Sequence, residues 1–62
     1  MANEKQIIKL EKEIISKMLA IKNKKMTPQE SGIGKLINLM KAFDEPLHDE
    51  LMGKYKKTLA EL

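Results

Sequence analysis

The sequence predicts an all-α fold, a small bundle of three helices packed up-down-up over about residues 3–25, 28–43 and 46–61. Three observations support it. Apolar residues recur at three- and four-residue spacing along most of the chain. Both prolines occur at short breaks, and residues that favour helix starts accompany them. A chain of 62 residues is long enough for one domain at most, so residues 1–62 form a single helical domain.

The first helix is predicted over about residues 3–25, where good helix formers follow one another without glycine or proline. Lysines fill its last turn, where the helix dipole favours cations. Lys9, Glu13 and Lys17 alternate in sign at four-residue spacing, a pattern typical of a solvent-exposed face. The apolar residues at helical spacing are Ile7, Ile8, Leu10, Ile14, Ile15, Met18, Leu19 and Ile21.

The apolar face of this helix is wider than one neighbour requires. At about 100° per residue, two apolar flanks lie on either side of a line through Glu11 and Met18, and together they span about 180°. An ordinary surface helix needs about 100°. We therefore expect a homodimer that buries the surplus, or a bundle that exchanges its third helix between chains. One flank carries Leu10, Ile14 and Ile21, and the other carries Ile8, Ile15 and Leu19.

Glu11 stands between these flanks, with isoleucines at all four of its helical neighbour positions. Its long side chain can reach water over a gap between helices. Alternatively it pairs with a lysine of another helix or chain and fixes the register, as polar core residues of coiled coils do. Lys35 and Lys41 are the candidate partners within the chain. The predicted interaction surface consists of Ile8, Glu11, Ile15, Met18, Leu19 and Lys22.

The second helix is predicted to begin at Thr27-Pro28-Gln29-Glu30, which has the order of a capping box with proline at the first helical position. Gly32 and Gly34 then fall in its first turns, where we expect them to allow close approach of another helix. Alternatively Ser31 is the N-cap and the helix starts later. The apolar face consists of Ile33, Leu36, Ile37, Met40 and Phe43, with Leu39 at its margin.

The third helix is predicted to start at Pro46, which cannot continue a preceding helix but suits a first turn. Either Asp44 or Glu45 supplies the N-cap. Asp49 and Glu50 follow near the positive end of the helix dipole. The apolar stripe of this helix consists of Leu47, Leu51, Tyr55, Leu59 and Leu62.

Two short motifs resemble parts of a phosphate-binding loop and of a metal site, but each lacks residues that such a site needs. The stretch SGIGKL resembles part of a phosphate-binding loop, but Gln29 stands where the first glycine belongs and Leu36 replaces the magnesium-binding serine or threonine. The helix after it presents isoleucine, leucine and methionine, which also excludes a DNA recognition helix. His48 and Asp49 form a pair found in metal sites, yet a chain with one histidine lacks the other ligands. We expect His48 to be half-exposed at a helix start.

Composition argues against an enzyme and against a cofactor or metal. The chain has no cysteine, which excludes thiolate metal sites, and with one histidine we expect no histidine-based metal cage. Ser16 and Ser31 have no acid–base partner at helical spacing. Three short helices can hardly enclose the roughly 300–1,000 Å³ of a ligand pocket. We therefore expect no catalytic residue, no small-molecule substrate and no bound cofactor.

The chain has no membrane-spanning pattern, since no apolar run approaches the roughly 18–20 residues that a span needs. Met1 leads into mixed charge without the apolar core of a secretory signal. Together with the absence of cysteine, this predicts a cytoplasmic protein, most simply of a bacterium or phage. The predicted first helix also lacks the aromatic anchors that membrane-surface helices usually have.

Two functions remain. The first is a small regulator or inhibitor that binds another protein through an apolar helical face, which frequent methionine and a small core favour. The second is a nucleic-acid-binding helical dimer, since the net charge is +3. All twelve basic residues are lysine, and the absence of arginine disfavours reading of base edges. The candidate anion contacts are Lys24, Lys25, Lys54, Lys56 and Lys57.

Overall fold

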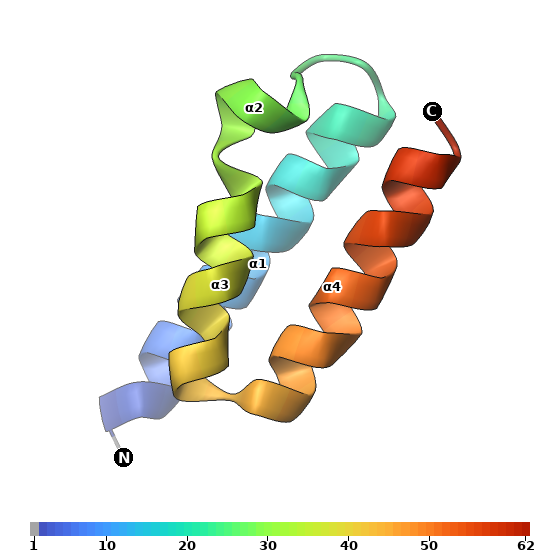
Figure 1. Ribbon diagram of the computed structural model, residues 1–62. Helices are drawn as coiled ribbons and strands as arrows, with labels where there is room; N and C mark the ends of the chain where they lie inside the picture. Colours follow the sequence, from blue (N-terminus) through green and yellow to red (C-terminus); the bar gives the residue numbers. More distant parts are fainter. Residues whose placement is uncertain (1) are drawn as a thin grey trace.

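The computed structural model describes residues 2–62, with side chains from residue 4 onward, and confirms the all-α fold. Figure 1 shows the long helices alternating in direction, with α3 in front of α1 and α4 beside them, and α3 packs against both α1 and α4. The molecule is elongated, with extents of 37 × 17 × 14 Å. The helices of residues 2–62 are α1 (Ala2–Lys22), α2 (Pro28–Ser31), α3 (Ile33–Phe43) and α4 (Glu45–Ala60).

The hydrophobic core lies where α3 packs against α1 and α4. α1 and α4 contact each other less than either contacts α3. The side of α1 that faces α4 is therefore less covered than the side that faces α3. Leu36, Phe43, Leu47 and Tyr55 pack against the margin of the core. The buried core side chains are Leu10, Ile14, Met18, Ile21, Ile33, Ile37, Met40 and Leu51.

α1 ends at Lys22, three residues before the predicted end. The Lys24 amide donates to the Ile21 carbonyl at 3.0 Å, and the Lys25 amide donates to the Ala20 carbonyl at 2.9 Å. These are the two bonds of a Schellman motif, which needs a left-handed residue after the helix. Lys24 takes that conformation with φ at 61°. This position is usually glycine, so a lysine there does not indicate that the helix stops.

The predicted second helix is broken in two by Gly32. Thr27 forms the expected capping box with Glu30, because the Glu30 amide donates to Thr27 Oγ1 and the Glu30 carboxylate accepts from the Thr27 amide. The helix then stops at Gly32, whose φ of 66° is left-handed and favours glycine. A side-chain carbon at Gly34 would have no neighbour within 4 Å. The prediction that these glycines allow close helix packing is therefore wrong.

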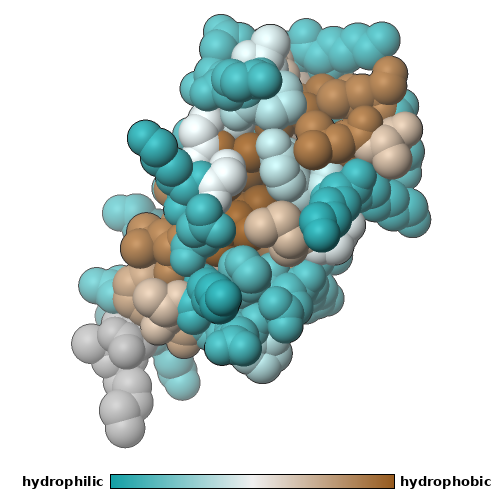
Figure 2. Space-filling model, viewed as in Figure 1, coloured by the Kyte–Doolittle hydropathy of each residue, from teal (hydrophilic) through white to brown (hydrophobic). Residues whose placement is uncertain are grey.

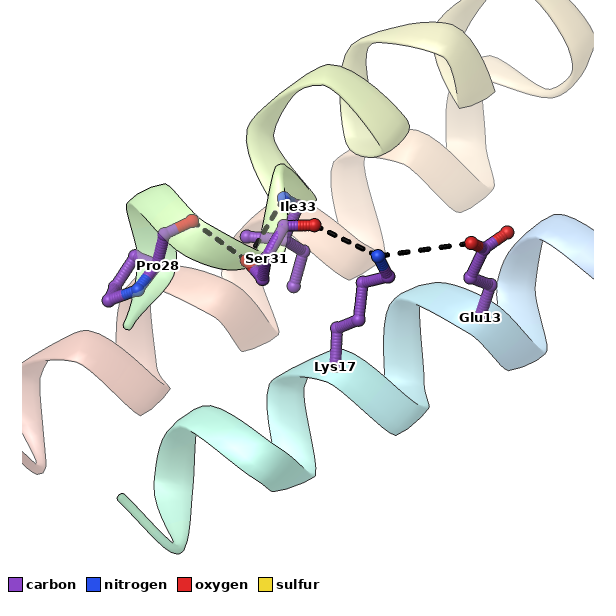
Figure 3. Close-up of polar contacts among 5 residues, drawn as sticks. All are labelled: Glu13, Lys17, Pro28, Ser31 and Ile33. Atoms are coloured by element: carbon purple, nitrogen blue, oxygen red, sulfur yellow. Dashed lines mark hydrogen bonds and ion pairs between the residues drawn. The ribbon is translucent and has the colours of Figure 1, made fainter. Parts of the chain in front are cut away.

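Ser31 and Lys17 hold α2 against α1 (Figure 3). Ser31 Oγ donates to the Pro28 carbonyl at 2.7 Å and accepts from the Ile33 amide at 3.1 Å. Lys17 Nζ donates to the Ser31 carbonyl at 2.9 Å and lies 3.9 Å from the Glu13 carboxylate. Lys9 and Glu13 are exposed as expected, but Lys17 is half-buried because its ammonium satisfies a backbone carbonyl of α2.

Asp44 is the N-cap of α4, and its carboxylate accepts from the Leu47 amide at 3.1 Å. The helix begins at Glu45, one residue before the predicted start, so Pro46 occupies its second position. It ends at Ala60. His48 is more buried than expected, with a side chain 12% exposed and its Nδ1 atom 3.0 Å from the Asp49 carboxylate. α4 packs against α3.

Candidate protein-docking surface

Most of the predicted interaction residues form one exposed row along α1. Ile8, Ile15 and Leu19 are 51%, 43% and 58% exposed. Lys22 is exposed at the end of the row, and Glu11 is half-buried within it. The name α1 strip refers below to Ile8, Glu11, Ile15, Leu19 and Lys22. Met18, the remaining predicted interaction residue, is 7% exposed and belongs to the core.

The strip is exposed because the other helices cover the opposite flank of α1. Ile14 and Ile21 are fully buried, and Lys17 beside them reaches α2. On the other side, α4 borders the strip without covering it. A shallow hollow of about 190 Å³ opens between them, and Met18 lies within it. The lining residues are Ile15, Met18, Leu19 and Lys22 from α1 and Thr58 from α4.

Glu11 has no cationic partner among the described side chains. No lysine of residues 4–62 lies within ion-pair distance of its carboxylate, and Lys35 and Lys41 are exposed elsewhere. Lys22 likewise has no acidic partner in this part of the chain. The structure thus offers no support for the predicted pairing of Glu11 within the chain.

The lysines gather in one half of the molecule. Segments 17–35 and 54–62 contain eight lysines and two glutamates, whereas segment 41–53 contains four acidic residues and one lysine. Lys24 and Lys25 lie in the turn after α1, and Lys54 is 4.0 Å from Glu50 of the same helix. Lys56 lies about 160° around α4 from Lys54. The predicted anion contacts therefore share an end of the bundle but do not form one continuous face.

Two other apolar areas were missed by the sequence reasoning. Leu39 is 49% exposed and lines a hollow of about 260 Å³ between α1 and α3, with Leu10 and Phe43. At the end of α4, Leu59 and Leu62 are 39% and 53% exposed, and Figure 2 shows hydrophobic atoms gathered there. The marginal position of Leu39 on its predicted helix was the available signal. Nothing in the stripe of α4 distinguished its exposed end from its buried middle.

Within residues 4–62, no three histidine or acidic side chains come together as a metal site would require. No helix of residues 2–62 combines the length and hydrophobicity that crossing a bilayer takes. The surface can contribute apolar side chains and isolated charges, which suits contact with a macromolecule.

Comparisons of the chain with protein-family models, with curated proteins and with solved structures find no match.

Proposed function

We propose that this chain is a small, non-catalytic cytoplasmic protein that regulates or inhibits another protein by binding it through the α1 strip. The observation that supports the proposal is the exposure of Ile8, Ile15 and Leu19 on one flank of one helix. Residues at this spacing are the anchors with which an amphipathic helix docks in a groove or on a second helix. The proposal includes a homodimer that buries the same flank.

The strip is sufficient to guide a partner and too small to bind tightly alone. Fully burying a large aliphatic side chain contributes roughly 1.5–3 kcal/mol. Because these three side chains are already about half buried, docking adds roughly 1 kcal/mol for each. Association also has an entropic cost of at least about 4 kcal/mol. We therefore expect the partner to contact neighbouring surface as well, including Thr58 of α4.

An affinity capture compares variants that differ in one exposed leucine. The tagged chain is used to retain partners from a cell extract, alongside Leu19→Ser and Leu39→Ser. Both leucines are about half exposed, so the two variants change surface hydrophobicity equally and lie on different faces. We expect Leu19→Ser to lose a partner that the unaltered chain and Leu39→Ser retain. Equal retention by both variants, or no specific protein, contradicts the proposal.

The concentration of lysine in one half of the molecule favours a second candidate, a nucleic-acid-binding helical dimer. Binding carried by phosphate contacts must weaken steeply with salt, by roughly one power of salt concentration for each contact. Titration of labelled duplex and single-stranded oligonucleotides at rising salt tests this. Paired Lys24→Ala and Lys25→Ala changes should reduce the slope, and Lys5→Ala and Lys9→Ala serve as the control. Absence of binding at low salt removes this candidate.

A further inference from the structure

We propose that a second copy of this chain occupies the α1 strip, antiparallel to the first across a two-fold axis, with Glu11 of each copy against Lys22 of the other. The inference rests on the proposed function, because it assigns an occupant and a geometry to the same surface. It makes Glu11 the residue that selects the direction and register of the dimer.

The positions of the residues along α1 define the axis. Ile15, Leu19, Glu11 and Lys22 lie within an arc of about 80° around the helix. Ile15 and Leu19 are symmetric about residue 17, and Glu11 and Lys22 are symmetric about a point between residues 16 and 17. The two centres differ by less than about 1 Å along the helix. One two-fold axis therefore places the leucine and isoleucine of both copies together at the middle and a carboxylate against an ammonium at each end.

Other arrangements of the same surface bring like charges or unpaired charges together. A parallel pair places Glu11 against Glu11 and Lys22 against Lys22, and like charges facing across an interface cost several kcal/mol. An antiparallel pair shifted by one helical turn places Glu11 against Leu19, which removes a carboxylate from water without a partner. A buried polar residue between apolar flanks selects a register in this way in coiled coils.

The chain has unused groups for this contact. Neither Glu11 nor Lys22 takes part in an ion pair among the side chains of residues 4–62, so dimerisation forms two pairs without breaking others. The two copies of α1 overlap from Glu11 to Lys22, about 17 Å of helix, which suits a small, transient interface. We therefore expect a weak, reversible dimer with a dissociation constant in the high micromolar to millimolar range. Because the dimer covers the docking surface, a protein partner must compete with the second copy.

Charge reversal tests the pairing. Sedimentation equilibrium measures the dissociation constant for the unaltered chain, for Glu11→Lys, for Lys22→Glu and for the variant that carries both. We expect each single reversal to weaken the dimer at least ~10-fold, since it opposes like charges at both ends. The double variant restores opposite charges and should recover affinity to within ~3-fold. Glu13→Lys and Lys9→Glu are the matched controls on the opposite face, and circular dichroism verifies that each variant is helical.

Spin labels test the direction. The chain has no cysteine, so Ser16→Cys and Lys5→Cys each introduce one label on an exposed position outside the strip. In the antiparallel dimer the two copies of residue 16 are offset by about 2 Å along the axis and those of residue 5 by about 35 Å. The residue-5 distance should therefore exceed the residue-16 distance by roughly 20 Å. Equal distances mean a parallel pair and overturn the proposal.

The outcomes separate this inference from the proposed function. A chain that stays monomeric at millimolar concentration, or a double variant without recovery, overturns the antiparallel dimer. Loss of partner capture on Leu19→Ser can still be observed in that case, and the docking function then stands without the dimer. Conversely, a dimer with the expected charge behaviour and no captured partner supports the inference and removes the partner protein from the proposed function.

Discussion

Two adjacent residues of α1 have opposite environments. Ile14 is 0% exposed and Ile15 is 43% exposed, although both are isoleucines in the middle of the same helix. Ile14 belongs to the flank covered by α3, and Ile15 belongs to the flank that α4 borders without covering. Residue type therefore does not distinguish the buried flank of α1 from its exposed flank. The difference comes from which side of the helix the rest of the chain packs against.

The largest expected effect on the free energy of unfolding comes from a substitution on the buried flank of α1. Ile14→Ala removes a fully enclosed side chain and should lower the free energy of unfolding by roughly 3 kcal/mol. A core of this size supplies only roughly 3–5 kcal/mol, so the variant should keep about 2 kcal/mol or less and unfold at low urea concentration. Urea titration followed by circular dichroism measures the loss. Ile14→Val keeps most of the side chain, should cost about 1 kcal/mol, and gives a measurable transition; no change with either variant contradicts the packing.

The second effect concerns the turn that directs α3 onto the buried flank. Gly32→Ala should lower the free energy of unfolding by roughly 1–2 kcal/mol, because a left-handed backbone opposes any side-chain carbon. The position has no neighbour within 4 Å of an added carbon, so the loss comes from the backbone alone. Thermal unfolding measures it. Gly32→Asn should lose less, since asparagine tolerates this conformation better, and equal losses for alanine and asparagine would argue against a left-handed backbone at this position.

A smaller effect of opposite sign is expected two residues later. Gly34 lies inside α3 with open space around it, so Gly34→Ala should raise the free energy of unfolding by about 0.5–1 kcal/mol. The same thermal measurement compares it with Gly32→Ala. Opposite signs at the two positions sharpen the distinction between a glycine that the turn requires and one that the helix tolerates. Destabilisation at Gly34 would mean that another helix packs there.

The smallest effect on stability is expected on the exposed flank of α1. Ile15→Ser should change the free energy of unfolding of the monomer by about 0.5 kcal/mol or less, since surface substitutions away from packed contacts are usually this mild. The measurement is made at low micromolar concentration, where the proposed dimer dissociates. The same variant should reduce partner capture and self-association. A loss comparable to that of Ile14→Ala would place Ile15 in the core and exclude a docking role.

Residues that turn the chain show where sequence reasoning reached its limit. The capping box at Thr27 and the N-cap at Asp44 were predictable, because their signals are local hydrogen bonds between neighbouring residues. The break at Gly32 and the end of α1 were missed. Both depend on a left-handed residue, and Lys24 gives no sequence sign of that conformation. The predicted first helix was therefore three residues too long at its end, and α2 and α3 were predicted as one helix.

The amino-acid sequence alone determined the helical class, the face of α3 that packs, the Leu47, Leu51 and Tyr55 part of the packing face of α4, and the double-width apolar face of α1. These properties follow from the spacing of side chains around a helix, which is fixed by backbone geometry. The tertiary structure decided which half of that face is core, and it placed Met18 inside and Leu19 outside. It also brought the Lys17 ammonium within hydrogen-bonding distance of a backbone carbonyl of α2. Those outcomes depend on the directions in which the turns at Lys24 and Gly32 send the following chain, and no periodicity in the sequence encodes a direction.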